Sequence, residues 1–494
     1  MSSPLAYTRY GTVAGLWRDG AARFYGVPYA AAPVGPLRFA PPRPPVPWSR
    51  IRNSTEPAPV APQPAGPLAD PHRGMSEDCL TVDIVTPTMT GGHPVLVWLH
   101  GGGYFAGSSI EPDTDGGQLA ATYGTVVVSI THRLGLLGFL DLEDSGVPGS
   151  GNAGLLDIVA ALRWIHENIA SFGGDPSRIT VAGHSGGGGK TSMIMSMPAA
   201  KGLINGAVVM AGPEFDLNTV QRARTTLLGT LATLGISRCA SGTLKRLRDV
   251  PLTDLLQAQE QLGVGAVPGP DSMRFSPVIG RSVLPLSPSQ AFSTGASAKV
   301  PMILGTARDE AHIGVRPTPG VPVPTLSEVQ LLGLLADGLD HPKDAEKIVS
   351  RYRALHPRFP NRDLFLGIAS DQFRIRTLRM AEARLQGGAE RTYVYRYDAS
   401  GREAVASHGA EVASFFALRG EPDGLATALV AFARDGRPPS HWPPYTIEAR
   451  HELRVSNDCI AAVPDPDAPS RSAWKGVSTG PGSNPWARLI QSSL

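Results

Sequence analysis

The feature that most constrains the fold is a series of short runs that are apolar at nearly every position and bounded by glycine or proline. PVLVWL at 94–99, TVVVSI at 125–130 and RITVAG at 178–183 are such runs, and VPMILG at 300–305 and TYVYRY at 392–397 follow later. A strand that is apolar on both faces belongs in a sheet that helices cover on both sides. The runs therefore predict buried strands of one layered sheet.

Helical patterns separate these runs. AGLLDIVAALRWIHENIAS at 153–171 places apolar residues at helical spacing, and the following Gly173-Gly174 should end that helix. A second helical segment is expected at 363–386. Alternation of strands and helices predicts an α/β fold with a large, mainly parallel, doubly wound sheet. Since no internal repeat or long hydrophilic linker divides the chain, residues 1–494 are expected to form one domain.

Two proline clusters lie before the first apolar run, PPRPPVPW at 41–48 and EPAPVAPQPAGPLADP at 56–71. Proline fixes φ and removes a backbone donor, so both segments are expected to be irregular loops. The alternative, that they form a wall of a binding cleft, stays open at this point.

Charge and composition exclude several classes of function. Lys+Arg total 45 against 43 Asp+Glu, so no overall field favours nucleic acid or an anionic membrane. No apolar stretch reaches the roughly 18 residues that a membrane span requires, and the first residues lack a secretory pattern. The three cysteines, Cys79, Cys239 and Cys459, have none of the paired spacings that bind zinc. Their odd, sparse number favours a reducing compartment, and a cytoplasmic location is expected.

A nucleophile motif follows the run at 178–183. Gly183-His184-Ser185-Gly186-Gly187 is a G-x-S-x-G placed between a predicted strand and a predicted helix. In that context the serine sits on a strained turn that raises its Oγ above the sheet edge, and glycines on either side let neighbouring backbone pass. The motif alone is weak, because glycine-rich turns are common.

A second glycine motif strengthens the first. His100-Gly101-Gly102-Gly103-Tyr104 follows the run at 94–99. Bare glycine amides can approach a substrate carbonyl, so the N–H groups of Gly102 and Gly103, with that of Gly186, are predicted to form an oxyanion hole. A flexible turn is the bland alternative, but it does not account for the pairing of this loop with a nucleophile motif.

At this point the sequence resembles the type-B carboxylesterase family, which includes bacterial para-nitrobenzyl esterases and animal cholinesterases. The matching blocks keep the family's order and cover most of the chain; they are FYGVPYAAAPVGPLRF (24–39), SEDCLTVDIVTP (76–87), HGGGYFAGS (100–108), THRLGLLGFL (131–140), the segment 151–188, GTARDEA (305–311), SHGAEV (407–412) and FARDGRPPSHWPPY (432–445). The resemblance implies an α/β-hydrolase fold, ester hydrolysis and no metal or organic cofactor.

The resemblance also implies a catalytic triad. The family's acid falls on Glu310 and its base on His408, and the order Ser185, Glu310, His408 is the order of this fold. His408 would move the proton between Ser185 and the leaving alcohol, while Glu310 would orient the ring. Other ionisable residues are weaker candidates. His312 is too close in the sequence to Glu310 to face it easily across a site, and His441 and His451 match the motif poorly. Asp309 is expected to be a structural or solvated carboxylate, and Glu411 is expected to support the local fold or to brace His408.

Two structural ion pairs are implied in the same way, Arg38 with Glu77 and Arg133 with Asp175. We interpret these residues as supporting the fold rather than the chemistry.

The chain departs from the family pattern around the nucleophile. Many members have Glu before the serine and Ala after it, where this chain has His184 and Gly186. The run Gly186–Gly189 opens a helix at a cost of about 0.5–1 kcal/mol per glycine; whether tight packing or local freedom requires it is left open, as is the role of His184.

Other departures lie further from the nucleophile. The cysteine that pairs with Cys79 in secreted relatives is replaced by Ala61, and a helper serine is replaced by Ala211. No tryptophan lies between Trp48 and Trp98, where cholinesterases carry their choline-stacking residue, so cholinesterase activity is not expected.

The predicted function is hydrolysis of a small-molecule carboxylic ester through an acyl-enzyme. Two rivals remain: hydrolysis of an amide or carbamate by the same residues, and a non-catalytic binding protein on the same fold. Intact triad and glycine motifs argue against the second rival. The pocket walls are expected from loops such as 60–75, 264–276 and 313–330, whose shapes the sequence does not give. The preferred acyl and alcohol groups and the oligomeric state are therefore left open.

Overall fold

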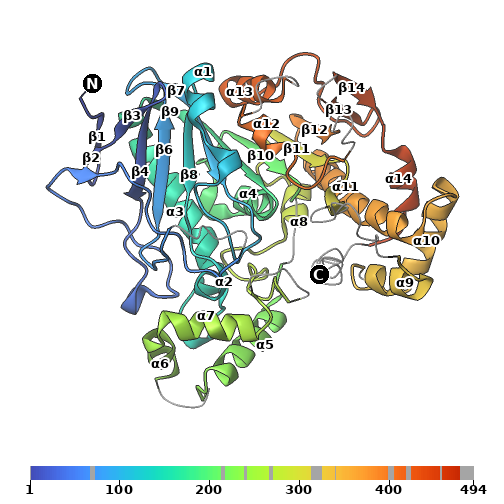
Figure 1. Cartoon of the computed structure of the whole chain (residues 1–494), viewed down its shortest axis with the longest axis horizontal. Coiled ribbons are helices and arrows are strands. Elements are labelled where there is room, and N and C mark those ends of the chain that lie inside the picture. Colours follow the sequence, from blue (N-terminus) through green and yellow to red (C-terminus); the bar gives the residue numbers. More distant parts are fainter. Residues whose placement is uncertain are drawn as a thin grey trace, which may run out of the picture.

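A computed structural model describes residues 2–66, 73–212, 217–237, 242–265, 271–312, 325–339, 341–398, 405–418, 424–456 and 459–478 (Figure 1). Within these ranges eleven strands form the central sheet: β3 (Leu16–Arg18), β4 (Ala21–Pro28), β6 (Thr81–Thr86), β7 (His93–Leu99), β8 (Val126–Ile130), β9 (Gly174–His184), β10 (Gly206–Met210), β11 (Met302–Ala307), β12 (Thr392–Tyr397), β13 (His451–Val455) and β14 (Ile460–Pro464). A small sheet near the N-terminus contains β1 (Leu5–Thr8), β2 (Gly11–Ala14) and β5 (Arg52–Asn53).

The central sheet has the order β14-β13-β12-β11-β10-β9-β7-β8-β6-β4-β3. Its middle, from β8 to β13, is parallel, and the strands at both edges are antiparallel. Every predicted apolar run lies on one of the parallel strands. Because the carboxyl ends of parallel strands meet at one edge of a sheet, the loops after β7, β9, β11 and β12 share that edge.

Helices cover both faces of the sheet, as the doubly apolar strands require. Their bounds are α1 (Gly117–Tyr123), α2 (Gly135–Phe139), α3 (Ala153–Asn168), α4 (Gly186–Ser196), α5 (Val220–Thr233), α6 (Thr243–Asp249), α7 (Leu252–Gln261), α8 (Pro288–Ser293), α9 (Glu328–Ala336), α10 (Asp344–Leu355), α11 (Asn361–Gln386), α12 (Val412–Phe415), α13 (Leu425–Asp435) and α14 (Ala468–Ala473). The predicted α/β-hydrolase architecture, with a large sheet between two helical layers, is confirmed.

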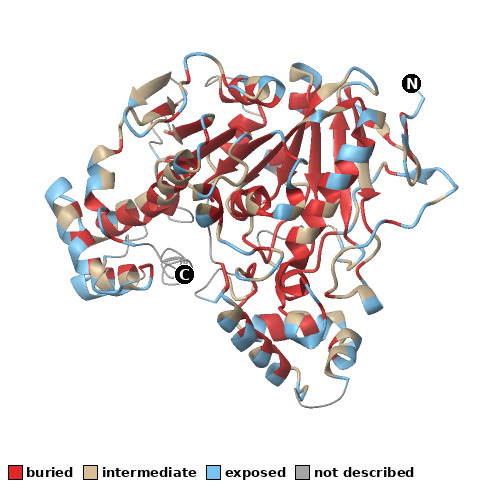
Figure 2. Cartoon of the chain, turned by 180° about the vertical axis from the view of Figure 1, so that it is seen from behind, coloured by how far each residue is buried: buried red, intermediate tan, exposed pale blue. Residues whose placement is uncertain are grey.

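Alternate side chains of one strand enter two different cores. Along β7, Val95 and Val97 pack with residues of α3, α4 and α11, whereas Leu96 and Trp98 pack with residues of α1, α12 and α13. Figure 2 shows the buried sheet between exposed outer helical surfaces. The helix expected at 153–171 is α3, which passes into a 3-10 turn at Ile169–Phe172 and ends at Gly173 with φ 79°.

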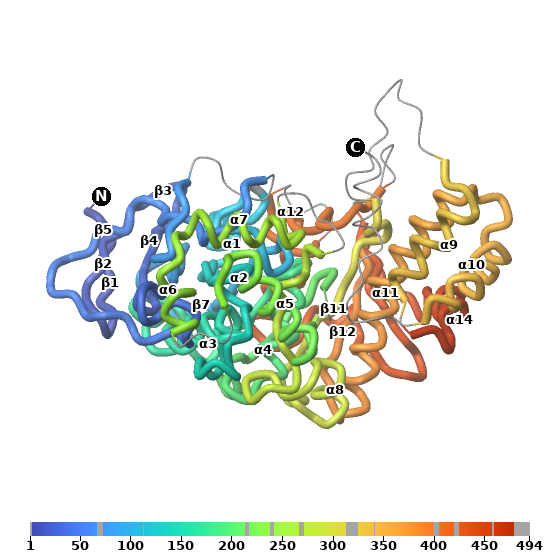
Figure 3. The backbone as a smooth tube through the Cα atoms, turned by 90° about the horizontal axis from the view of Figure 1, so that it is seen from below, coloured from blue at the N-terminus to red at the C-terminus, as the bar shows by residue number. Residues whose placement is uncertain are grey.

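Two groups of helices extend beyond the layers. Helices α5, α6 and α7 lie together on one side, and α9, α10 and α14 gather around the N-terminal part of α11 at one end of the molecule (Figure 3). No helix in the described ranges is both long enough and apolar enough to cross a membrane.

Candidate active site

Ser185 lies at the carboxyl end of β9, immediately before α4. Its backbone has φ 57° and ψ −122°, a conformation that costs a non-glycine residue about 1–3 kcal/mol. Two hydrogen bonds hold this turn: the amide of Ser185 donates to the carbonyl of Met210 at 2.8 Å, and the amide of Gly189 donates to the carbonyl of Ser185 at 3.0 Å. The predicted strained elbow is thus present, and the sheet and helix on either side maintain it.

The glycine run after Ser185 is required by close packing. A Cβ atom added to Gly186 would lie 2.2 Å from the carbonyl oxygen of Gly103, and one added to Gly187 would lie 1.9 Å from that of Leu99. Both approaches are closer than any real side chain allows. Tight packing against β7 and the loop that follows it, rather than local freedom, therefore requires glycine at positions 186 and 187.

The glycine loop after β7 meets the start of α4 at this contact. Gly102 and Gly103 have φ 78° and 61°, left-handed conformations that favour glycine. In the part of the chain that the structure describes, the amides of Gly102, Gly103 and Gly186 donate no hydrogen bond to protein. Three neighbouring backbone donors therefore remain available to a ligand. They lie close to Ser185, since a Cβ added to Gly101 would stand 3.7 Å from the Cβ of Ser185.

A residue of the second proline cluster fixes the far end of this loop. Gln63 is fully buried; its amide nitrogen donates to the carbonyl of Gly107 at 3.0 Å, and its oxygen accepts from the amide of Gly107 at 2.9 Å. This role was not predicted from the sequence; the single amide side chain in a run of proline and alanine is the signal that could have indicated it. The cluster is irregular where described, and 67–72 lie outside the described residues.

A second predicted pocket loop also reaches the glycine loop. The Cε atom of Met273, in the segment 264–276, lies 2.8 Å from where a Cβ on Gly103 would stand. Residues 266–270 of this segment and residues 313–324 of the segment 313–330 lie outside the described residues.

Glu310 and His408 are brought together from the loops after β11 and β12. The Oε2 atom of Glu310 is 2.5 Å from Nδ1 of His408, while Oε1 accepts from the amide of Ala307 at 2.7 Å. Glu310 is fully buried, and the His408 side chain is 5% exposed. Since a carboxylate only accepts, Nδ1 of His408 carries the hydrogen, and Nε2 is the nitrogen that can act as a base.

The neighbouring Asp309 aligns these two loops. Asp309 and Ser407 form an isolated parallel bridge, in which the amide of Asp309 donates to the carbonyl of Ala406 at 2.9 Å. The side chain of Asp309 accepts from the amide of Ala406 at 2.9 Å. The prediction that Asp309 is structural is confirmed.

His184, which precedes Ser185, lies against His408. Its ring centroid lies 4.3 Å from that of His408, with the planes tilted by 47°. It also lies against Gly409, since a Cβ there would stand 3.1 Å from Cε1 of His184. Burial, together with the neighbouring His408, lowers the pKa of His184 well below its ordinary value, so this ring is neutral. Ser185 is the next residue in the chain after His184.

Glu411 supplies a second buried carboxyl group near Glu310. The hydroxyl of Tyr395 donates to Oε1 of Glu411 at 3.3 Å. Burial, and then the charge of Glu310, raise the pKa of Glu411 to about 8. Glu411 is therefore protonated at neutral pH, and its contact with Tyr395 on β12 supports the local fold as expected.

One of the two implied ion pairs is present and the other is wrong. Nε of Arg38 donates to Glu77 at 2.8 Å. Arg133 pairs instead with the fully buried Asp157, through Nε at 2.8 Å and Nη2 at 2.6 Å. Asp175 lies at the N-terminal end of β9, whereas Arg133 follows the C-terminal end of β8. Because these strands run parallel, the two residues lie at opposite ends of the strands. Asp175 pairs locally with Arg178 at 2.7 Å.

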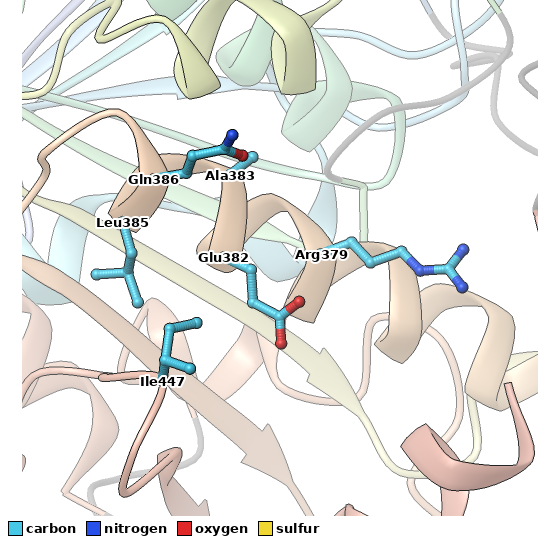
Figure 4. A pocket seen from close by; sticks show the side chains of 6 residues that line it. All are labelled: Arg379, Glu382, Ala383, Leu385, Gln386 and Ile447. Carbon is cyan, nitrogen blue, oxygen red and sulfur yellow. The ribbon is translucent and has the colours of Figure 1, made fainter. Parts of the chain in front are cut away.

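A separate surface pocket of about 480 Å³ lies at the C-terminal end of α11 (Figure 4). Its lining residues are Arg379, Glu382, Ala383, Leu385, Gln386 and Ile447. None of the predicted site residues belongs to this lining.

Comparison with known proteins identifies the family. The model of the carboxylesterase family matches residues 2–462. The chain belongs to the carboxylesterase family. It is 33% identical over 500 residues to the para-nitrobenzyl esterase of Bacillus subtilis (strain 168), covering 95% of this chain and 98% of that protein. It is 31% identical to the liver carboxylesterase of Sus scrofa over 510 residues, which cover 90% and 88% of the two chains.

Solved structures agree with the sequence relatives. A PNB esterase structure superposes with a TM-score of 0.82 at 32% identity and covers 96% of this chain and 100% of that chain. A carboxylesterase from Geobacillus stearothermophilus superposes with a TM-score of 0.83 at 32% identity and covers 95% of this chain and 100% of that chain. The chain is therefore a carboxylesterase with the α/β-hydrolase fold.

Proposed function

We propose that this carboxylesterase hydrolyses small-molecule carboxylic esters through a Ser185–His408–Glu310 triad and an acyl-enzyme. The observation that carries the proposal is the 2.5 Å contact between Glu310 and His408, formed where the His408 ring lies against His184, the residue before Ser185. This arrangement supports the three roles of nucleophile, base and orienting acid.

The proposed reaction begins with Ser185. Nε2 of His408 takes the hydroxyl proton as Oγ attacks the ester carbonyl, and the carbonyl oxygen becomes an anion. The amides of Gly102, Gly103 and Gly186 stabilise that anion; removal of one such donor costs about 10²–10³ in rate in a comparable enzyme. Collapse of the intermediate breaks the ester bond, and His408 gives its proton to the leaving alcohol.

Deacylation repeats the same steps with water. His408 takes a proton from water as the hydroxide adds to the acyl carbon, and it returns the proton to Oγ of Ser185 as the carboxylic acid leaves. Glu310 holds the imidazole in the required tautomer throughout and stabilises the imidazolium.

A series of para-nitrophenyl esters of increasing acyl length tests the proposal, with Ser185→Ala as the variant and Ser196→Ala, at the end of the same helix, as its control. We expect wild type and Ser196→Ala to hydrolyse the short esters and to take a covalent label from an organophosphate. Ser185→Ala should lose the label and nearly all turnover. Retained turnover in Ser185→Ala contradicts the proposal, and a larger kcat/KM for a matched anilide would favour amide hydrolysis.

A further inference from the structure

A buried lysine lies one turn beyond the nucleophile. Lys190 on α4 is fully buried, and its Nζ is 3.1 Å from Nε2 of His132, in the loop after β8. Burial lowers the pKa of Lys190 to about 7, although the nearby charge of Glu111 acts to raise it. An amine in this position is costly to bury, and the proposed mechanism does not use it. Its contacts indicate what it does.

The partner of Lys190 has a defined tautomer. Nδ1 of His132 lies 2.9 Å from the carbonyl oxygen of Arg133. A carbonyl only accepts, so the hydrogen of the neutral ring is on Nδ1, and Nε2 accepts from Lys190. Burial, followed by the charge of Lys190, lowers the pKa of His132 well below its ordinary value, which keeps the ring neutral. The amine therefore orients this imidazole by donating to it.

The oriented ring reaches the glycine loop through a second histidine. The rings of His132 and His100 are stacked, with centroids 4.9 Å apart and planes 7° apart. Nδ1 of His100 lies 2.9 Å from the carbonyl oxygen of Gly101 and donates to it by the same reasoning. That carbonyl and the N–H of Gly102 belong to one planar trans peptide and point in opposite directions. His100 thus sets the direction of the Gly102 N–H.

We propose that Lys190 is a positioning residue for the oxyanion hole, acting through His132 and His100 on the Gly101–Gly102 peptide. The three side chains come from α4 and from the loops after β8 and β7, so they connect the helix that follows the nucleophile to the loop that receives the substrate oxygen. In this proposal Lys190 acts through its contact with His132 and takes no part in proton transfer. The inference rests on the proposed function, because it assigns the Gly102 amide its role there.

Three variants of α4 test the inference. Lys190→Met keeps the length and apolar volume of the side chain but removes the donor, while Lys190→Gln keeps a donor for His132. Ser192→Ala is the control, since the hydroxyl of this equally buried residue bonds to Gly188 and Met380 and not to the glycine loop. The measurements are kcat and KM for a short para-nitrophenyl ester, the Tm, and inhibition by a trifluoromethyl ketone, to which a serine adds reversibly.

We expect Lys190→Met to lower kcat about 10- to 100-fold, less than the loss of a whole oxyanion donor, with KM changed less than about threefold. The ketone should bind more weakly by a similar factor, because its adduct places an oxygen anion in the same hole. Lys190→Gln should recover most of kcat, and Ser192→Ala should resemble wild type. His132→Leu removes the ring that lies between Lys190 and His100, and it should reproduce the kinetic effect of Lys190→Met. If Lys190→Met does not fold, His132→Leu serves as the test instead.

The inference is overturned if Lys190→Met and His132→Leu keep wild-type kcat and ketone affinity, even with a lowered Tm. It is also overturned if Lys190→Gln loses as much activity as Lys190→Met, because the donor is then irrelevant. Both outcomes leave the proposed triad intact. An inactive wild type, in contrast, would remove the proposed function and this inference with it.

Discussion

Two groups of ionisable side chains lie near Ser185, and they differ in which atoms the proposed mechanism brings to the substrate. The base side contains His184, His408, Glu310 and Glu411; the oxyanion side contains His100, His132, Lys190 and Glu111. On the base side a side chain exchanges protons in the proposed mechanism, so its protonation has to change in each cycle. On the oxyanion side the proposed mechanism brings backbone amides to the substrate and uses the side chains only to orient them, so the two imidazole rings there have to stay neutral.

Burial serves both requirements in different ways. On the base side the pKa of Glu411 is raised to about 8, which keeps a second negative charge away from Glu310 at neutral pH. On the oxyanion side burial lowers the pKa of His100 and of His132 well below their ordinary values, which prevents either ring from changing its hydrogen-bonding pattern. Burial thus keeps Glu411 uncharged in one cluster and keeps both imidazole rings neutral in the other.

The largest expected effect is on the base side. Glu310→Gln should lower kcat by about 10⁴-fold, because an amide group favours the wrong tautomer of His408. Steady-state kinetics on a short ester measures the loss. Asp309→Asn, which keeps an oxygen to accept from the amide of Ala406, should lose less than about tenfold. A comparable loss in both variants would show that loop geometry, rather than the hydrogen of His408, limits the rate.

The next largest effect is expected on the oxyanion side, from a substitution that disturbs the packing of the backbone. Gly187→Ala places a Cβ against the carbonyl of Leu99 and should lower the free energy of unfolding by about 1–3 kcal/mol and kcat by about 10²-fold. Gly367→Ala on α11 is the control, because the added Cβ has no atom within 4 Å apart from its chain neighbours and its own helix backbone; it should stabilise the protein by about 0.5–1 kcal/mol. Denaturant unfolding and kinetics give both quantities. Full activity in Gly187→Ala would contradict the role assigned to close backbone approach.

A smaller effect is expected on how stability depends on pH, and it differs between the two clusters. The pKa of Glu411 is raised from 4.5 to about 8, so between these values the folded state binds more protons than the unfolded state, and stability falls as pH rises. Glu411→Gln removes this dependence. Its Tm relative to wild type should rise between pH 5 and 8, by about 2 °C, as followed by thermal unfolding. A constant difference would mean that Glu411 is ionised throughout.

The contribution of Lys190 to stability should change with pH in the opposite direction. Its pKa is lowered from 10.5 to about 7, so the folded state binds fewer protons across that range, and stability rises with pH. The Tm of Lys190→Met relative to wild type should therefore fall between pH 7 and 10, by about 2 °C. A difference that rises over this range would contradict a buried lysine that is neutral above pH 7.

The strands, the elbow and the glycine loop could be predicted from the sequence because each depends on local chemistry. A doubly buried strand needs an apolar run, and a strained turn between backbones needs glycine, so both leave a signal within a few residues. The proposed acid and base could be located only through the resemblance to the carboxylesterase family, since Glu310 and His408 are distant in the sequence and meet through the pairing of β11 with β12.

What could not be predicted depends on partners that the fold brings from elsewhere. Asp157 stands within the apolar pattern LLDIVAAL, and a lone acid there is a sign of a buried ion pair, but the pattern does not identify Arg133 as the partner. Lys190 likewise stands among glycines and small residues in a helix without a polar face. Each residue shows that a compensating contact exists without showing which one.

The bridge between Asp309 and Ser407 has a consequence for protein synthesis. The proposed nucleophile Ser185 and the glycine loop have been synthesised once the chain reaches Met210, whose carbonyl accepts from the amide of Ser185. The proposed base, His408, follows about 200 residues later, more than the commonest domain length of about 100–150 residues, and it is aligned only when the two loops are bridged. A nascent chain should therefore be unable to attack cellular esters until its C-terminal part has left the ribosome.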